Sequence, residues 1–178
     1  MHKFISSFLI VIFISAAQVL AENRPQKFGA FQISHSLTLP GTPEALFDQI
    51  TGDISGWWDH SMSENPLKFY IEPTPGGGFY EIFDESGNGV KHAEVIYAQR
   101  GKLLRFVGPL GLSGYAIQLV TTYQFEPVNE DSVKLSVTVN ACGQIEDGWA
   151  ETVDGVWYHF IFERLKPYIE NQTGYQKE

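Results

Sequence analysis

Residues 149–169 read WAETVDGVWYHFIFERLKPYI, and this stretch decides the fold. Its apolar side chains recur at steps of three and four residues, the spacing that places them on one face of an α-helix. We therefore predict a long amphipathic helix near the end of the chain. Pro167 has no amide hydrogen and its ring meets the carbonyl oxygen of Glu163, so we expect a kink or a tightened turn there. The apolar positions are Trp149, Val153, Val156, Trp157, Phe160, Ile161, Leu165, Tyr168 and Ile169.

The region before this helix, residues 67–142, reads as one short strand after another. Runs rich in β-branched and aromatic residues alternate with turn sequences, such as PTPGGG at residues 73–78 and SGNG at residues 86–89. Short strands joined by such links are typical of an antiparallel meander. The sequence thus predicts about six neighbouring strands directly before the helix.

The segment of residues 28–58 predicts a first strand followed by short helices. Residues 31–39 alternate between apolar and polar side chains, which indicates a strand with one buried face. Thr42 followed by Pro43 is typical of a helix start, and Gly52 ends that helix. We expect a second short helix around residues 54–58. The complete order predicts an α+β fold, with about seven strands in an antiparallel sheet and helices on one side of it.

The composition limits the classes of protein to which the chain can belong. It has 178 residues, 43% of them hydrophobic, which fits one domain. The formal net charge of −9 argues against nucleic-acid binding, which needs a basic surface. A single cysteine excludes a framework of intramolecular disulfides. Aromatic residues make up 14% of the chain, and such bulky side chains either fill a core or line a pocket.

Residues 1–21, MHKFISSFLIVIFISAAQVLA, have the pattern of a secretory signal peptide. Lys3 precedes an apolar run, and small residues lead to an expected cleavage site after Ala21. The alternative is a retained membrane anchor, for which the apolar run of residues 4–20 is short. We expect an exported protein, periplasmic or secreted, without stable membrane insertion after cleavage. Its domain would span residues 28–170, followed by a polar tail at residues 171–178.

The expected export places the single cysteine, Cys142, in an oxidising compartment. Val137, Val139 and Ala141 before it indicate the end of a strand. We therefore expect Cys142 to be a buried, inert thiol.

The chain lacks the common motifs of nucleotide and ester chemistry. It contains neither the phosphate-binding loop of nucleoside triphosphatases nor the Gly-x-Ser-x-Gly elbow of α/β-hydrolases. Two pairs of potential metal ligands are present, Asp59 beside His60 and His159 four residues before Glu163. Neither pair belongs to a known metal-binding motif. We interpret both as surface or structural pairs, and we expect no metal and no cofactor.

Polar side chains interrupt the predicted apolar strand faces at His35, Glu81, His92 and Glu94. A charged group on a core-facing strand position is costly unless it is paired or hydrated. One interpretation is that these are hydrogen-bonded core groups, or that the register turns them outward. The other is that a few polar groups lie in an apolar cavity, where they orient a ligand or move a proton. A glutamate in such a cavity would have a raised pKa, suited to acid–base chemistry.

Several stretches, in this order, resemble the SRPBCC superfamily, also called START-like or helix-grip proteins. They are TPEALF at residues 42–47, GWW at 56–58, PGGGF at 75–79 and LRFVGPLG at 104–111, with VDGV at 153–156 and RLK at 164–166. The resemblance spans residues 28–170 and points to the branch of the heat-shock ATPase activator homologues and polyketide cyclases. It implies a strongly curved sheet that grips the C-terminal helix, with a cavity between them. It implies no single reaction, because members include lipid carriers, hormone receptors, cyclases and chaperone cofactors.

Our leading hypothesis is an exported domain that binds a small apolar or aromatic molecule in this cavity. It rests on the resemblance, on the abundance of aromatic residues and on the lack of a catalytic motif. The candidate ligand-binding residues are Trp57, Trp58, Phe69, Phe79, Glu81, His92, Phe106, Tyr115, Trp149, Val153 and Trp157.

Two alternative hypotheses stay open. The first is an enzyme that works in the same cavity, a cyclase, dehydratase or hydrolase, with Glu81 or His92 as its general base. The second is a protein-interaction module akin to the heat-shock ATPase activator homologues, which would use a sheet edge or the loop of residues 108–114.

Overall fold

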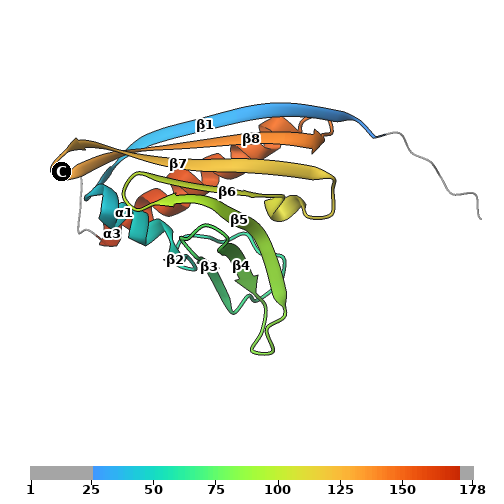
Figure 1. The fold of residues 1–178 in the computed structure, drawn as a ribbon, viewed down its shortest axis with the longest axis horizontal. Helices are drawn as coiled ribbons and strands as arrows, with labels where there is room; N and C mark the ends of the chain where they lie inside the picture. Colours follow the sequence, from blue (N-terminus) through green and yellow to red (C-terminus); the bar gives the residue numbers. More distant parts are fainter. Residues whose placement is uncertain (1–25, 173–178) are drawn as a thin grey trace, which may run out of the picture.

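One sheet of eight antiparallel strands forms the body of the protein (Figure 1). The computed structural model describes residues 26–172. Strands β2 to β8 form a meander in which each lies next to its neighbour in the chain, and β1 pairs with β8. The strands are β1 (Phe28–Pro40), β2 (Gly52–Asp53), β3 (Lys68–Ile71), β4 (Gly78–Ile82), β5 (Gly89–Gln99), β6 (Leu103–Gly108), β7 (Ile117–Asn129) and β8 (Ser132–Gln144).

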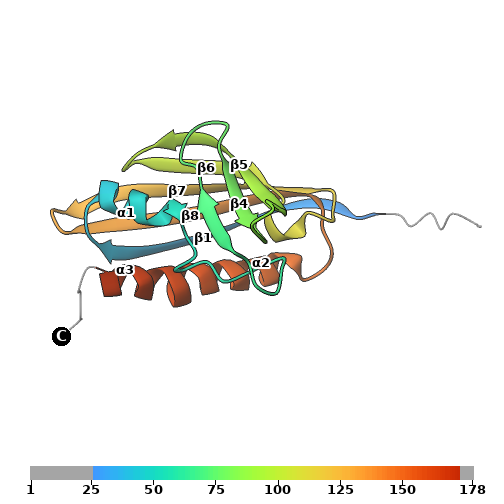
Figure 2. The ribbon, with the colours of Figure 1, turned by 90° about the horizontal axis from the view of Figure 1, so that it is seen from below.

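The C-terminal helix runs along one face of the sheet, close to β1 (Figure 2). It consists of α2 (Trp149–Tyr158), the π-helical η2 (His159–Leu165) and α3 (Lys166–Gln172). The shorter α1 (Pro43–Ile50) contacts β7. The end of the sheet that holds β3 and β4 bends away from the end that holds β1 and β8 (Figure 1). This curved sheet with its long helix confirms the predicted α+β, helix-grip fold. Among residues 26–172, no helix has the length and hydrophobicity needed to cross a bilayer.

Two details of the N-terminal part differ from the prediction. Gly52–Asp53 pair with β3 as an additional short strand, so the sheet has eight strands rather than about seven. Residues 54–58 form a turn instead of a second helix. Ile54 donates its N–H to the carbonyl of Phe69 in β3, while its own carbonyl accepts from Trp57 and Trp58. The segment is therefore tied to the sheet edge, and only a single turn fits before the chain leaves it.

The irregularity expected near Pro167 is present, but the helix widens there instead of tightening. The residues before this proline, His159–Leu165, form π-helical turns. The N–H of Lys166 donates to the carbonyl of Ile161, five residues earlier. A proline ring collides with the carbonyl four residues before it in a regular α-helix. Wider turns relieve that collision, and such π-bulges are frequent at functional sites.

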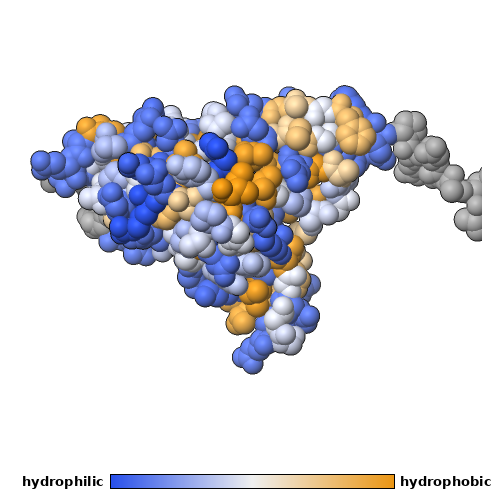
Figure 3. Space-filling model, in the orientation of Figure 1, coloured by the Kyte–Doolittle hydropathy of each residue, from blue (hydrophilic) through white to orange (hydrophobic). Residues whose placement is uncertain are grey.

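The hydrophobic core lies between the inner face of the sheet and the helix. Alternate residues of β8, from Val133 to Ala141, are buried and face the helix. Each large aliphatic or aromatic side chain buried in this way stabilises the fold by about 1.5–3 kcal/mol. The buried helix residues are Trp157, Phe160, Ile161, Leu165 and Ile169. The opposite face of the sheet is mostly hydrophilic, with a hydrophobic patch over its middle (Figure 3).

Two β-bulges in β5 change which of its side chains face inward. His92 has no paired residue in β4, and Ile96 has no paired residue in β6. His92 and its neighbour Ala93 are therefore both buried, while Ile96 is exposed. Glu94, expected on the same face as His92, is exposed as well. The strict alternation assumed from the sequence is wrong here, because each bulge inserts one residue and reverses the faces that follow.

Cys142 is exposed, contrary to the expectation of a buried thiol. It does lie in the last part of a strand, β8, as predicted. Its neighbours Val137, Val139 and Ala141 occupy the inner face. Side chains of a strand alternate between faces, so the residue that directly follows Ala141 points outward.

Candidate functional site

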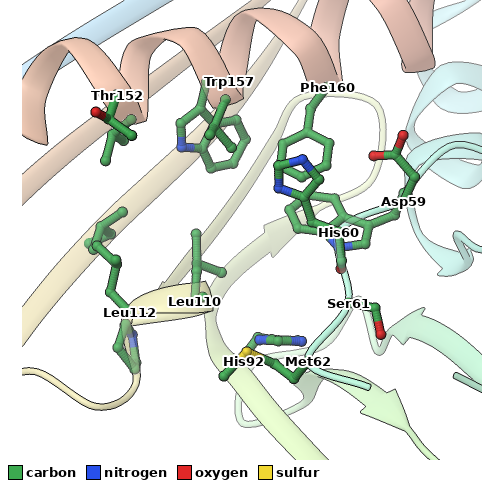
Figure 4. Close-up of a pocket in the computed structure, with 16 residues that line it drawn as sticks. Asp59, His60, Ser61, Met62, His92, Leu110, Leu112, Thr152, Trp157 and Phe160 are labelled. Atoms are coloured by element: carbon green, nitrogen blue, oxygen red, sulfur yellow. The ribbon is translucent and has the colours of Figure 1, made fainter. Parts of the chain in front are cut away.

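A pocket of about 470 Å³ opens between the C-terminal helix and the sheet (Figure 4). The helix forms one wall, and the short 3-10 helix η1 (Leu110–Leu112) forms the facing wall. The loop after Trp58 closes a third side, and β5 and β7 contribute His92 and Leu119. The remaining lining residues are Asp59, His60, Ser61, Met62, Pro109, Gly111, Thr152, Val153, Val156, Trp157 and Phe160.

Aromatic rings make one end of the pocket rigid. The ring of Trp58 stacks on Phe160, with centroids 3.8 Å apart and an interplanar angle of 14°. Trp157 meets Trp58 edge-on at 6.4 Å and Phe160 at 6.1 Å. These three rings come from the turn after β2 and from the helix, so they join two elements far apart in the sequence. Such aromatic pairs are worth about 0.5–1.5 kcal/mol beyond the area that they bury.

Leu110 holds an unfavourable backbone conformation in the opposite wall. Its φ is +51°, and it is the only residue other than glycine with a positive φ among residues 26–172. The left-handed region costs a residue with a Cβ atom about 1 kcal/mol or more. Leu110 is only 7% exposed and lines the pocket, so its burial offsets that cost. The loop of residues 108–114 thus directs this leucine toward the pocket.

His92 supplies the most deeply buried polar side chain of the pocket lining. It is 3% exposed, and the bulge in β5 turns it inward. Its Nε2 lies 3.0 Å from Oε2 of Glu81. Its other ring nitrogen, Nδ1, is buried and has no hydrogen-bond partner. A buried polar atom without a partner is costly, and a bound molecule could satisfy it.

Glu81 of β4 lies behind His92 and is fully buried. Its carboxylate accepts hydrogen bonds from Ser61 Oγ at 2.5 Å, from the N–H of Met62 at 3.0 Å and from the N–H of Ser63 at 3.3 Å. Burial raises the pKa of Glu81, but the hydrogen bonds from Ser61, Met62 and His92 outweigh burial and leave the pKa below its ordinary value. The raised pKa expected of a glutamate in an apolar cavity is not found for Glu81, because these hydrogen-bond donors surround its carboxylate.

The donors around Glu81 favour its ionised form, and that form sets the roles within the pair. An ionised Glu81 only accepts hydrogen bonds, so the hydrogen of His92 lies on Nε2 when the ring is neutral. Nδ1 of this pocket-lining residue then carries a lone pair. It can accept a hydrogen bond from a hydroxyl or amine of a bound molecule, or take up a proton from it. Glu81 orients the ring and is not itself the base.

A second group of polar residues meets at the edge of the pocket, where Asp59 approaches His159 of η2. Oδ2 of Asp59 lies 3.0 Å from Nε2 of His159, and Nδ1 of His159 lies 2.8 Å from Oε2 of Glu163. The ring of His60 stacks on that of His159, with centroids 5.5 Å apart. The hydrogen bonds from His159 to Glu163 and to Asp59 raise the pKa of His159. The two pairs identified separately in the sequence thus form one cluster.

The structure places the predicted site residues in three groups. Trp58, His92, Val153 and Trp157 line the pocket, and Glu81 contacts it only through His92 and the loop of residues 61–63. Tyr115 and Trp149 form an edge-on pair 4.9 Å apart, outside the pocket lining. Four aromatic residues belong to the core: Trp57, Phe69, Phe79 and Phe106.

Several lining residues were missed by the sequence analysis. Thr152, Val156 and Phe160 share a helix face with Val153 and Trp157, so the helical spacing could have identified them. The loop residues 59–62 have no periodic pattern, and no signal of that kind was available for them. His35, the remaining polar candidate, faces the helix, where Nε2 lies 3.0 Å from Oδ1 of Asp154.

Comparison with known proteins supports the fold. No family model matches the chain, and no curated protein matches it. A protein of unknown function from Staphylococcus aureus has a TM-score of 0.60 and 10% identity, over 83% of this chain and 98% of its own. DynU16, a protein of the dynemicin biosynthetic locus, has a TM-score of 0.55 and 16% identity, over 79% of this chain and 48% of its own.

The Aha1 dimer from Colwellia psychrerythraea is also similar, with a TM-score of 0.52 and 18% identity over 79% of this chain and 96% of its own. These neighbours agree with the SRPBCC or START-like resemblance. At such low identities the likeness concerns the architecture and leaves the activity to the site itself. The chain therefore has a helix-grip fold of the START-like kind.

Proposed function

We propose that the pocket binds a small apolar or aromatic molecule that carries one hydrogen-bond donor. The observation that supports this most strongly is that His92, which lines an otherwise largely apolar pocket, has a buried Nδ1 without a hydrogen-bond partner. Binding sites for small molecules combine apolar walls with a few placed polar groups. A hydroxyl or amine that donates to Nδ1 would satisfy the nitrogen and fix the orientation of the molecule.

The size and walls of the pocket support the same proposal. Its volume of about 470 Å³ falls within the range of roughly 300–1,000 Å³ that encloses small organic ligands. The rings of Trp58, Trp157 and Phe160 offer flat surfaces for an aromatic molecule. The leucines Leu110, Leu112 and Leu119 complete the apolar lining.

A pocket-filling variant tests this proposal. Val153→Phe adds a ring in the pocket wall, whereas Val128→Phe adds the same ring at an exposed position of β7 outside the lining. We expect the wild-type protein and Val128→Phe to bind the fluorescent probe 1-naphthol with equal affinity, and Val153→Phe to bind it at least tenfold more weakly. Equal binding by all three proteins would contradict the proposal.

A second candidate function is an enzyme in the same pocket, a cyclase, dehydratase or hydrolase. The Glu81–His92 pair supports it, because a carboxylate that orients an imidazole is the usual arrangement of a general base. A general base in the pocket can be tested with 5-nitrobenzisoxazole, an aromatic molecule whose five-membered ring opens in one step when a base removes its proton. The base removes the proton on carbon 3, and the electron pair of that C–H bond forms the nitrile triple bond. The N–O bond breaks at the same time, and its electron pair ends on the phenolate oxygen.

We expect the protein to accelerate this ring opening, and His92→Phe to lower the rate to that of buffer. Glu81→Gln should slow the reaction while 1-naphthol still binds. A rate that His92→Phe leaves unchanged would remove His92 as a base in this pocket. The ligand-binding proposal would be unaffected by that result.

We also propose that the chain is an exported member of the branch that it resembles. The proposal rests on residues 1–21, which lie outside the described residues. Expression in a bacterium with an intact export pathway should yield a mature protein that begins at Glu22. Intact-mass measurement of the exported fraction checks this, and a protein that keeps residues 1–21 and stays with the membranes would contradict it.

A further inference from the structure

We infer that Asp59, His60 and His159 form a binding site for a divalent transition-metal ion at the edge of the pocket. The site concerns side chains other than the Glu81–His92 pair, and it does not depend on the proposed ligand. Two imidazoles and one carboxylate are a ligand set that suits zinc and ferrous ions. The three residues come from two elements that the fold brings together, the loop after Trp58 and the π-helical η2.

The distances fit such an ion with a small movement. One ligand atom from each of the three residues lies within 4.8 Å of the others. In tetrahedral coordination with bonds of about 2.0–2.1 Å, ligand atoms lie roughly 3.3 Å apart. Asp59 and His159 already meet this requirement, with Oδ1 and Oδ2 at 3.1 Å and 3.0 Å from Nε2. Only His60, an exposed residue whose ring stacks on that of His159, has to reorient and approach further.

The surroundings of His159 resemble those of a metal ligand. A histidine that binds a metal usually gives its other ring N–H to a carboxylate, which fixes the ring and its tautomer. Nδ1 of His159 lies 2.8 Å from Oε2 of Glu163, one turn further along the helix. Nε2 is thereby directed toward Asp59 and the proposed ion. The stacked ring of His60 limits the rotation of His159 on its other side.

Arg164 is the cation that competes for this position. Its Nε lies 3.1 Å from Oδ2 of Asp59, without hydrogen-bond geometry. The nearby charges are thus the carboxylates of Asp59 and Glu163 and the guanidinium of Arg164. A metal ion would share Asp59 with Arg164 and be repelled by it. Removal of this positive charge should therefore strengthen metal binding.

The site lies beside the pocket, since Asp59 and His60 also line it. Three protein ligands leave at least one coordination position of a zinc or ferrous ion open. An oxygen donor of a molecule in the pocket, such as a carboxylate or hydroxyl group, is the class of ligand that would complete the coordination.

Titration of the purified, metal-free protein with Zn²⁺ in a calorimeter, and with Co²⁺ followed by visible absorption, tests the inference. We expect saturable binding of one ion per chain and the intense visible bands of low-coordinate Co²⁺. His60→Ala, which removes an exposed side chain, should weaken binding at least tenfold, and His159→Ala should abolish it. The matched control His35→Ala removes a histidine outside the cluster and should leave the affinity unchanged.

Two further variants test the arrangement around the ligands. Glu163→Gln should weaken Zn²⁺ binding by about 10–100-fold, the usual effect of removing the carboxylate behind a metal-bound histidine. Arg164→Gln should strengthen it. The absence of saturable binding would overturn the inference. So would equal affinities for Zn²⁺ of His60→Ala, His159→Ala and the control His35→Ala. No organic ligand is added, so the result is independent of the 1-naphthol experiment.

Discussion

Nε2 of His92 lies 3.0 Å from Oε2 of Glu81, and this contact joins the pocket to the loop that closes it. On one side, His92 lines the pocket. On the other, the same carboxylate holds the loop through Ser61 and the N–H of Met62. One buried acidic group thus positions both the polar atom of the pocket and one of its walls.

Glu81→Gln should therefore destabilise the protein by about 2–3 kcal/mol. Hydrogen bonds to charged groups are worth about 1.5–3 kcal/mol, and the new amide would turn a donor toward groups that already donate. Urea unfolding measures the change. Glu94→Gln, at an exposed position of the neighbouring strand, is the matched control and should change the free energy of unfolding by less than about 0.5 kcal/mol. Similar effects of the two substitutions would show that the buried carboxylate does not hold the loop.

The same residue should make stability depend on acid pH. The pKa of Glu81 in the folded state lies below its ordinary value of 4.5, so the unfolded chain binds a proton more readily. The stability that ionised Glu81 contributes is therefore fully present above pH 4.5, and it is lost as the pH falls through the lowered folded value. Urea unfolding between pH 6 and pH 3 should show a steeper decline for the wild type than for Glu81→Gln. Parallel curves would contradict a lowered pKa.

Gly108→Ala should disturb the pocket by moving His92. A Cβ atom at position 108 would collide with the backbone of His92 and Ala93, because β6 passes very close to the bulge in β5. Overpacking of this kind costs about 1–3 kcal/mol. We expect weaker 1-naphthol binding and lower stability. Gly114→Ala, where the added Cβ meets no atom within 4 Å, is the control. If Gly108→Ala behaves like Gly114→Ala, the close packing of β6 on the bulge is not needed.

Cys142 should react with thiol reagents in the folded protein. Its side chain lies on the outer face of β8 and is exposed. Ellman's reagent added without denaturant should label it stoichiometrically, at a rate close to that of the unfolded chain. A thiol that is labelled only after unfolding would mean that the outer face of β8 is covered.

The sequence predicted the elements where periodic patterns are long. The apolar spacing from Trp149 to Ile169 predicted the gripping helix, and the alternation of residues 31–39 predicted β1. Glu81 lies two residues after Phe79 and would share its face in a regular strand, and the structure buries both side chains. Such patterns succeed because one face of a helix or strand must be buried along its whole length.

The remaining features depend on contacts that no local pattern records. His92 and Glu94 are two residues apart and would share one face of a regular strand, yet a bulge leaves the first buried and the second exposed. The lowered pKa of Glu81 depends on donors from residues 61–63, about twenty positions away in the sequence. Likewise, Asp59 and His159 are 100 residues apart and meet because the fold brings the loop after Trp58 against the C-terminal helix.

The most direct test of the account compares 1-naphthol with 1-methoxynaphthalene, which has the same rings but no hydroxyl donor. In the wild type, the hydrogen bond to His92 Nδ1 should favour 1-naphthol by about 1 kcal/mol, or about fivefold in affinity. In His92→Phe, which has no acceptor, the ratio of the two affinities should fall by the same factor. A ratio that is identical in the two proteins would contradict a pocket organised around His92.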